Sequence, residues 1–163
     1  MAIDTTLFRR SMAQFATGIT VVTTHDTSGQ RMGLTVNAFA SVSLDPPLVL
    51  VSIDNRSETH RGFESSGVFG VSVLAEGQED WSRRFARPGH DKWDGVILET
   101  GVTGVALIPG ALSHVECRVV ARHPAGDHVI YVGEVERLAV TPGRPLLYHA
   151  SDYCQLESPA KVK

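Results

Sequence analysis

Two neighbouring segments with a side-chain period of two constrain the fold more than any other feature of the sequence. Between residues 115 and 122, apolar or small side chains occupy every second position, and mostly charged ones stand between them. Residues 125–127 (Ala-Gly-Asp) predict a turn, and residues 128–138 return with apolar or small residues on one face. A period of two is typical of β-strands, because successive side chains point to opposite faces of a sheet. The pattern therefore predicts two strands joined by a turn.

Further strands are predicted by short runs of branched and aromatic residues that end at glycine, proline or polar clusters. Such runs occupy residues 19–24, 32–40, 48–53, 68–75 and 146–148. Pro46 and Pro47 mark a break before the strand at 48–53, because proline cannot lie inside a central strand. The unbroken apolar run Leu48–Val51 predicts a strand that is covered on both faces.

Two or three helices accompany these strands. Asp4 can cap a first helix that carries apolar residues at helical spacing and ends at Gly18. Ser57 can cap a short helix to about Glu64, and residues 78–86 also have helical spacing. Because strands and helices do not alternate regularly, we expect a mainly β fold with helical additions, a β-barrel, and not a doubly wound parallel sheet. With no internal repeat or charged linker, residues 1–163 are predicted to form a single domain.

The charge balance and hydropathy argue against several classes of protein. Lys plus Arg number 15 and Asp plus Glu 18, which gives a net charge of −3. Proteins that bind nucleic acids normally carry a basic excess or stripe, so none is expected as a partner. No apolar run approaches the roughly 20 residues of a membrane span, and residues 1–10 lack the apolar stretch of a signal peptide. We therefore expect a cytoplasmic protein with no membrane partner.

Metal-site and nucleophile motifs are weak or missing. Cys117 and Cys154 stand far apart and outside any C-x-x-C motif, so two unpaired thiols are expected. Only His114 and Glu116 bring two possible ligands onto one strand face, and without a third ligand we predict no metal. No predicted strand is followed by a P-loop, a G-x-S-x-G or a G-x-G-x-x-G motif. NTP hydrolysis is therefore disfavoured and a hydrolase triad has weak support, whereas nucleotide binding through other loops stays open.

Residues 33–60 form the stretch with the most potential for ligand binding. Its small side chains would let a flat ring approach the backbone, whose N–H and C=O groups could contact the edge of that ring. A polar cluster follows the strand at 48–53, and in it Ser57 and Thr59 stand where a helix is predicted to begin. Hydroxyls at a helix start with Arg56 nearby suit a phosphate group. The alternative is a tight barrel strand followed by an ordinary helix cap.

Two shorter segments also have two interpretations each. His128 follows a turn, where it is either an exposed residue at the start of a strand or part of a ligand site at the end of a barrel. The segment Phe85-Ala86-Arg87 is either a helix end packed on the core or an aromatic wall beside a cation. Neither segment decides between its interpretations by itself.

Taken along its whole length, the sequence resembles the short-chain flavin reductases that serve two-component, flavin-dependent monooxygenases. Five blocks in the family's order carry the resemblance and span nearly the full chain. They are FRRSMAQFATGITVVTT (8–24), GLTVNAFASVSLDPPLVLVSIDNRSETH (33–60), FGVSVLAEGQEDWSRRFA (69–86), GDHVIYVGEVERL (126–138) and PLLYHASDY (145–153). The second and fourth blocks are the most specific, because each is long and few other folds show either.

The resemblance implies a Greek-key split β-barrel that binds flavin, usually as a homodimer with the flavin near the interface. It implies that backbone groups line the edge of the isoalloxazine ring and that polar side chains hold the ribityl chain and phosphate. The implied flavin-binding residues are Thr35, Val36, Asn37, Ala38, Ser41, Ser52, Asp54, Asn55, Ser57, Thr59, Phe85 and Arg87. The residues implied to lie near the nicotinamide are His128, Tyr148 and Tyr153.

The implied reaction is hydride transfer from NADH or NADPH to FMN or FAD, with the reduced flavin passed to a separate monooxygenase. Both reactive atoms belong to cofactors, so no side-chain acid or base is expected. The protein would hold the two rings about 3–3.5 Å apart and stabilise the developing negative charge with N–H donors. Two alternatives stay open: a split-barrel protein that keeps its flavin and reduces another acceptor, and a non-catalytic module that binds flavin or haem. The choices between FMN and FAD and between NADH and NADPH stay open as well.

Overall fold

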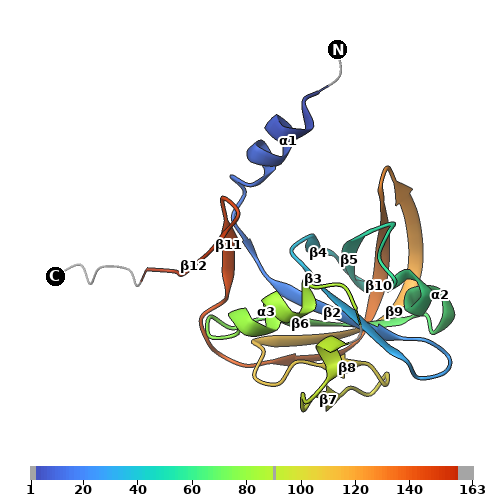
Figure 1. Cartoon of the computed structure of the whole chain (residues 1–163). Coiled ribbons are helices and arrows are strands. Elements are labelled where there is room, and N and C mark those ends of the chain that lie inside the picture. The colour runs from blue at the N-terminus through green and yellow to red at the C-terminus, as the bar shows by residue number, and fades with distance from the viewer. Residues whose placement is uncertain (1–2, 90, 158–163) are drawn as a thin grey trace.

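The main structural unit is a seven-stranded antiparallel sheet. The structure, a computed structural model, describes residues 3–89 and 91–157. The strands of this sheet follow one another in the order β3-β2-β6-β9-β10-β5-β4 (Figure 1). Their bounds are β2 Thr20–His25, β3 Arg31–Val36, β4 Phe39–Leu44, β5 Pro47–Asp54, β6 Val68–Val73, β9 Ser113–Ala125 and β10 His128–Val140. The hairpin predicted from the period of two is β9 and β10, which pair along most of their length.

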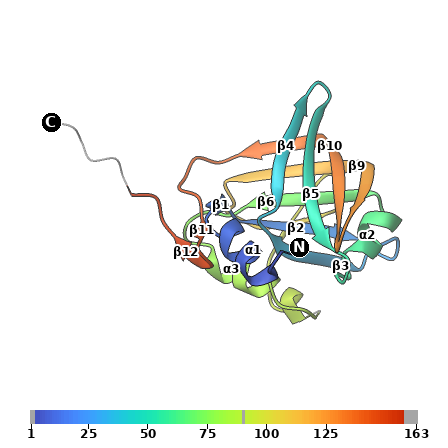
Figure 2. The ribbon, with the colours of Figure 1, turned by 90° about the horizontal axis from the view of Figure 1, so that it is seen from above.

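The connections between these strands give a Greek-key barrel that stays split. β2 pairs with β6, and β10 pairs with β5, although the members of each pair are well separated in sequence. The sheet curls so that β3 and β5 approach each other, and Figure 2 shows the strong twist this requires. Within the described ranges, the edge strands β3 and β4 do not pair with each other. The predicted mainly β fold with helical additions is therefore confirmed.

The curled sheet encloses its core through alternate side chains of each strand. On β5, Val49, Val51 and Ile53 are buried, and the side chains between them are half exposed. Tyr131 on β10 is 1% exposed, and its ring centroid lies 4.4 Å from that of Phe63. Aromatic side chains bury the largest apolar areas, so contacts of this kind dominate the stabilisation of such a core.

Helices and two small sheets surround the main sheet. They are α1 (Thr5–Met12), β1 (Thr17–Gly18), α2 (His60–Ser65), α3 (Glu79–Phe85), a 3-10 turn (Asp91–Trp93), β7 (Glu99–Thr100), β8 (Ala106–Leu107), β11 (Leu147–His149) and β12 (Asp152–Cys154). α2 packs on β2 and β6, and α3 packs on β2 and β3. β1, β11 and β12 form one small antiparallel sheet, and β7 and β8 form the other.

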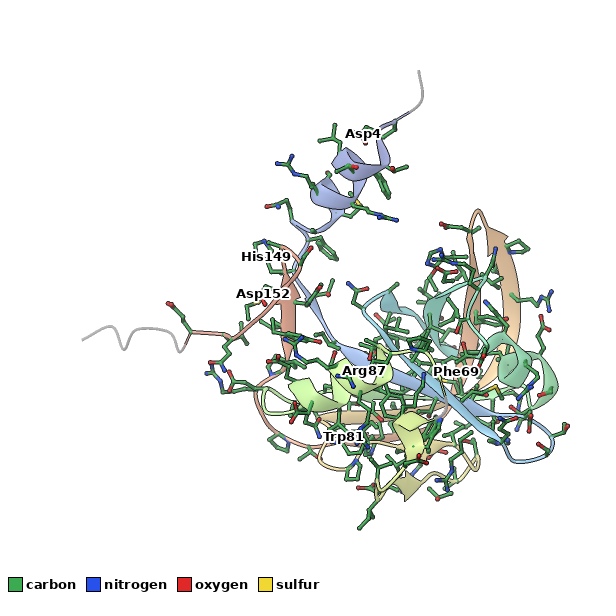
Figure 3. All side chains as sticks on the ribbon, in the orientation of Figure 1. Asp4, Phe69, Trp81, Arg87, His149 and Asp152 are labelled. Carbon is green, nitrogen blue, oxygen red and sulfur yellow. The ribbon has the colours of Figure 1, made fainter. Side chains whose placement is uncertain are left out.

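α1 stands away from the sheet, and none of its residues is buried (Figure 1). Asp4 caps it as predicted, because its side chain accepts a hydrogen bond of 2.8 Å from the backbone N–H of Thr6. The backbone N–H of Ala150 donates to the carbonyl of Ala13 and ties the end of the helix to the β11–β12 turn. Figure 3 shows Asp4 at the outer end of this arm, far from Phe69 in the sheet.

The predicted helix end at Gly18 is wrong. α1 ends at Met12, and Ala13 closes it in the right-handed conformation. Gly18 is extended and pairs with Leu147, while Thr17 pairs with Tyr148. The pairing of β1 with β11 satisfies backbone groups that a longer helix would have satisfied internally. That partner lies about 130 residues away in sequence, so local spacing could not reveal it.

The strand predicted for residues 32–40 is two strands. β3 ends at Val36 and β4 begins at Phe39, with Asn37 and Ala38 between them. β3 pairs with β2, whereas β4 pairs with β5 at the opposite end of the sheet order. A run of strand-forming residues carries no mark of the point where the chain leaves one partner for another. The structure also adds β12, which was not predicted.

Burial departs from the predicted pattern at two places. Glu116 alternates with the apolar positions of β9, where a charged side chain ordinarily faces solvent, yet it is only 3% exposed. Its Oε2 accepts hydrogen bonds of 2.8 and 2.7 Å from the backbone N–H and the hydroxyl of Thr103, which lies between β7 and β8. The apolar run Leu48–Val51, predicted to be covered on both faces, is buried on one face only in the single chain. Loop coverage and exposure of this kind are tertiary features that strand periodicity does not contain.

Candidate functional site

Two cavities lie next to each other along β3. The larger has a volume of about 580 Å³ and is lined by residues 31–34, by residues between 54 and 59, and by residues between 85 and 93. The smaller has a volume of about 200 Å³. Ala86, directly after α3, lines both cavities. The two hollows therefore meet at the end of α3.

The loop between β5 and α2 forms one wall of the larger cavity. The Oδ1 atom of Asp54 accepts the backbone N–H of Arg56 at 2.9 Å, and the Arg56 guanidinium donates to both carboxylate oxygens. These hydrogen bonds hold the pKa of Asp54 well below its usual range. The hydroxyls of Ser57 and Thr59 lie 2.7 Å apart. The loop thus presents a guanidinium group and two hydroxyls within six residues.

Ser57 is not the cap of the helix that follows. α2 begins at His60 with Thr59 at the cap position, and no side chain caps it. The backbone N–H of Ser57 donates instead to the carbonyl of Asp54 at 2.8 Å and closes a tight turn. The prediction that Ser57 caps a helix is wrong because this turn places the helix start three residues later.

The end of α3 forms the opposite wall. Phe85 is 1% exposed and packs directly on β3 at Gly33, where a Cβ atom would stand 3.1 Å from its ring. The ring of Trp93 meets Phe85 edge-on at 4.9 Å. The Lys92 ammonium donates to the carbonyl of Gly33 at 3.1 Å. Phe85 packs on the core, as the first interpretation of this segment predicts, and Phe85 and Arg87 both line the larger cavity.

Basic side chains outnumber acidic ones around the larger cavity. The basic residues that line it are Arg31, Arg56, Arg87 and Lys92, and the acidic ones are Asp54 and Glu58. Charge-assisted hydrogen bonds from Arg and Lys are the strongest contacts available to a phosphate group. Figure 3 shows Arg87 beside α3. The arrangement suits an anionic group with several oxygens.

The smaller cavity is aromatic and hydroxyl-rich. Tyr148 and Tyr153 line it from β11 and β12, with their rings edge-on at 5.4 Å. The Tyr153 hydroxyl lies 2.9 Å from the Ser82 hydroxyl, and the Thr35 hydroxyl donates to the Ser82 carbonyl at 2.6 Å. The Arg83 guanidinium lies 4.7 Å above the ring of Tyr153. These contacts join β3, α3 and β12 around one hollow.

The structure brings together nine of the fifteen residues implied by the family resemblance. Those that line the larger cavity are Asp54, Ser57, Thr59, Phe85 and Arg87. Those that line the smaller cavity are Thr35, Asn37, Tyr148 and Tyr153. The other six, Val36, Ala38, Ser41, Ser52, Asn55 and His128, line neither cavity of the single chain. Val36 is buried in the core, so only its backbone could contact a ligand.

His128 lies beside the larger cavity without lining it. It begins β10 directly opposite Asp54 in the strand register, and its side chain is 39% exposed. Its Nδ1 atom lies 2.7 Å from Oδ1 of Asp127, and this hydrogen bond lowers the pKa of Asp127. Asn55 joins the same corner, because its backbone N–H donates to the carbonyl of Asp127. Both interpretations of His128 therefore stay open.

Several cavity residues were not singled out from the sequence. Arg31 comes from β3, and Lys92 and Trp93 come from the 3-10 turn. The last two belong to a stretch that was predicted only as a long connection, so nothing in its local pattern pointed to a site. Arg56 was noted only for its charge near Ser57. A basic residue beside a polar cluster is the one sequence signal by which the other cavity residues could have been found.

The described ranges contain neither a metal-ligand cluster nor a helix that could span a membrane. Within residues 3–89 and 91–157, no three His, Cys, Asp or Glu side chains are grouped as a metal site requires. His114 and Glu116 contact different loop residues, Ile108 and Thr103. Cys117 and Cys154 are free thiols. In the same ranges no helix has the length and apolar character needed to cross a membrane.

The sequence is similar to a known protein family and to individual members of it. The family described as "Flavin reductase like domain" matches residues 12–157. The chain is 44% identical to an NADH-dependent flavin reductase of a Rhodococcus species, over 91% of this chain and 85% of that protein. It is 40% identical to the flavin-dependent monooxygenase reductase subunit HsaB of Mycobacterium tuberculosis, over 95% of this chain and 84% of that protein.

A solved structure extends the likeness to the fold. It is the Streptomyces globisporus NADH:FAD oxidoreductase SgcE6 in complex with NAD and FAD fragments. Its TM-score is 0.91 at 36% identity, and the match covers 97% of this chain and 96% of that one. With the family match, these likenesses show that the chain belongs to the flavin reductase family.

Proposed function

We propose that this protein is a flavin reductase that transfers a hydride from NADH to FMN or FAD and supplies the reduced flavin to a separate monooxygenase. The observation that carries the proposal is the pair of adjoining cavities in a chain of this family. One cavity suits a phosphate and the other is aromatic, which is what a flavin nucleotide and a nicotinamide ring need. The choice of NADH follows the name of the Rhodococcus relative, an NADH-dependent flavin reductase. The monooxygenase partner follows the name of the Mycobacterium tuberculosis relative, a reductase subunit of a flavin-dependent monooxygenase.

The flavin phosphate belongs at the basic wall of the larger cavity. Ser57, Thr59 and Arg56 offer two hydroxyls and a guanidinium group there, and Arg87 lines the same cavity. The ring then lies along β3 towards Thr35 and the smaller cavity. Backbone groups from residues 35–38 would contact its edge, which is consistent with side chains of Val36 and Ala38 that line no cavity.

The flavin supplies the hydride acceptor, and the chain supplies position and electrostatics. Backbone N–H groups near the corner at Asn37 and Ala38 can stabilise negative charge that develops at the edge of the ring. The tyrosines of β11 and β12 exclude water from the face where the nicotinamide would stack. No side chain is required to carry a proton during the hydride step.

An anaerobic assay tests the reductase activity. We expect the protein to oxidise NADH, followed by its absorbance, only when FMN, FAD or riboflavin is present. NADPH serves as the comparison that establishes nucleotide preference. Folded protein that leaves both nicotinamides unoxidised with all three flavins would overturn the proposal.

We propose further that the protein is a homodimer and acts in the cytoplasm. Support for the dimer comes from apolar surface that the single chain leaves uncovered: Leu7, Phe8 and Met12 on α1 are each more than half exposed, and Leu44 on β4 is 96% exposed. Exposed apolar side chains that gather on one helix, as on α1, commonly mark an interface. Support for the compartment comes from the two free thiols, because secreted proteins of this size tend to pair their cysteines.

A further inference from the structure

We propose that His60 is a positioning residue for the flavin phosphate, acting through the carbonyl of Asp54. The inference rests on the proposed phosphate subsite in the larger cavity. His60 lines neither cavity, and it was not among the residues implied by the family resemblance. It stands at the first position of α2, where the loop from Asp54 to Thr59 ends.

Two hydrogen bonds fix the His60 ring. Its Nε2 atom lies 2.8 Å from the carbonyl oxygen of Asp54, and its Nδ1 atom lies 2.7 Å from the Tyr131 hydroxyl. A carbonyl oxygen only accepts, so Nε2 carries the proton and donates to Asp54. A neutral ring then has an acceptor at Nδ1, and the Tyr131 hydroxyl donates to it. One tautomer satisfies both contacts.

The chain of contacts anchors the phosphate loop to the rigid core. Tyr131 is 1% exposed on β10 and packs against Phe63, so its hydroxyl has little freedom to move. His60 links the fixed Tyr131 hydroxyl to the carbonyl of Asp54. The same carbonyl also accepts the backbone N–H of Ser57 at 2.8 Å. The bond from His60 to Asp54 therefore closes the loop into a ring of seven residues.

The closed loop fixes the positions of the Ser57 and Thr59 hydroxyls before a phosphate binds. Ser57 and Thr59 lie inside the closed loop, and their hydroxyls are 2.7 Å apart. A loop that is already ordered loses little conformational entropy when a phosphate binds, and this raises affinity without a new contact. We expect His60 to affect the binding of phosphorylated flavins and to leave the hydride step unchanged.

A matched pair of substitutions separates the two hydrogen bonds. In His60→Gln the amide nitrogen can take the place of Nε2 and still donate to Asp54. In His60→Asn the amide oxygen can take the place of Nδ1 and accept from Tyr131, but the side chain is too short to reach Asp54. Asn has a helix propensity close to that of His, and that of Gln is somewhat higher, so neither substitution breaks α2.

Binding of FMN and of riboflavin, measured by fluorescence titration, gives the decisive comparison. We expect His60→Asn to weaken FMN binding about 3- to 10-fold and His60→Gln to stay within about 2-fold of the unmodified protein. Riboflavin lacks the phosphate, so its affinity should be nearly equal in all three proteins. At saturating FMN, kcat should also be unchanged, so the loss appears in KM alone.

The outcomes are distinct from those that test the reductase activity. Equal FMN affinity in all three proteins, or the same loss for FMN and riboflavin, would overturn the positioning role while leaving the activity intact. An equal loss in His60→Gln and His60→Asn would overturn it too, because the bond to Asp54 would then not be the cause. If His60→Asn fails to fold, as shown by thermal unfolding, His60→Ala replaces it, because it also lacks the donor to Asp54, and a loss for FMN but not for riboflavin is again required. If His60→Gln fails to fold, Tyr131→Phe replaces it, because it too removes only the hydrogen bond between His60 and Tyr131, and its FMN affinity should stay within about 2-fold.

Discussion

Gly133 on β10 shows how a single missing side chain permits the core of the barrel. A Cβ atom at this position would stand 2.4 Å from the Phe69 ring and 2.8 Å from the Cβ of Cys117. Phe69 is fully buried, and its ring stacks on Phe63 at 5.1 Å. The ring therefore occupies the space that any other residue at position 133 would fill.

Replacement of this glycine should destabilise the fold. We expect Gly133→Ala to lower the free energy of unfolding by about 1–3 kcal/mol, because the added methyl group must displace Phe69 or the strand. Gly77→Ala is the control, since no atom lies within 4 Å of the corresponding Cβ position. Chemical denaturation measures both variants, and equal stability would contradict the packing argument.

The two thiols should differ sharply in reactivity. Cys117 is fully buried, and burial raises its pKa from an ordinary value of 9.0 to about 12, whereas Cys154 is half buried. Since the thiolate is the reactive form, we expect an alkylating reagent at pH 8 to modify only Cys154 in native protein and both thiols after unfolding. The neutral Cys117 thiol contributes stability that is lost as the pH rises from about 9 towards 12. Mass spectrometry locates the label, with Cys154→Ser as the control that should remain unlabelled; rapid native labelling of Cys117 would refute the prediction.

His128 and Ser57 should affect different steps of the reaction. If His128 lies beside the nicotinamide, His128→Ala should lower kcat/KM for NADH by about 5- to 150-fold and leave FMN affinity nearly unchanged. Ser57→Ala should mainly weaken FMN binding, because a hydroxyl on the phosphate acts equally in the ground state and the transition state. Steady-state kinetics and fluorescence titration measure the two effects. Unchanged kinetics in His128→Ala would leave it as an exposed residue at the start of a strand.

At the scale of elements, the β11–β12 hairpin is held between α1 and α3. Its turn residues Ala150 and Ser151 have positive φ angles of 50° and 69°. Two successive left-handed residues are typical of the two-residue turn that matches the twist of a hairpin, and Asn-Gly is favoured there. The hydrogen bond between the hydroxyls of Tyr153 and Ser82 connects the hairpin to α3. The contacts of the turn with Ala13 and of β12 with Ser82 therefore hold the hairpin in place and offset the backbone strain of the turn.

A better turn sequence should stabilise the protein. We expect the double substitution Ala150→Asn and Ser151→Gly to raise the free energy of unfolding by roughly 1 kcal/mol, because both residues then adopt the left-handed conformation at lower cost. Ser65→Gly at the end of α2 is the control and should destabilise instead, since glycine disfavours helix. Denaturant titration compares the three proteins. A loss of stability in the double variant would show that the turn is not strained.

At the scale of the whole molecule, the single chain is a split barrel with a buried core and an uncovered arm, α1. The split barrel buries its aromatic residues, whereas every residue of α1 is exposed or half exposed (Figure 1). A helix of eight residues is marginal by itself in water and gains most of its stability from packing. In the proposed dimer, a second copy would cover the arm with the apolar residues of β4 that are exposed in the single chain.

Charge placed on the arm should separate the proposed dimer. We expect Phe8→Glu combined with Met12→Glu to shift the protein from dimer to monomer in light scattering at micromolar concentration. Neither side chain is buried in the single chain, so the free energy of unfolding within a protomer should change little. Arg9→Glu on the same helix is the control for charge alone. The dimer proposal fails if the unmodified protein is a fully active monomer or if the double variant remains dimeric.

Local pattern was enough to predict most of the strands and the hairpin of β9 and β10. Side-chain alternation is a property of neighbouring residues, so it is visible in the sequence without knowledge of the fold. The family resemblance then implied residues at both cavities, among them Ser57, Thr59 and Tyr153. It could do so because it matched long blocks in which cofactor contacts and spacing occur together.

Tertiary structure decided what distant segments bring together. The switch from β3 to β4, the burial of Glu116 beneath Thr103, and the entry of Lys92 into the cavity all depend on partners far away in sequence. The bond from His60 to Asp54 is local, but its anchor, Tyr131, stands 71 residues further along the chain. Pairing and burial are decided by which surfaces meet once the chain has curled into a barrel, and the free energy of those contacts has no counterpart in any window of neighbouring residues.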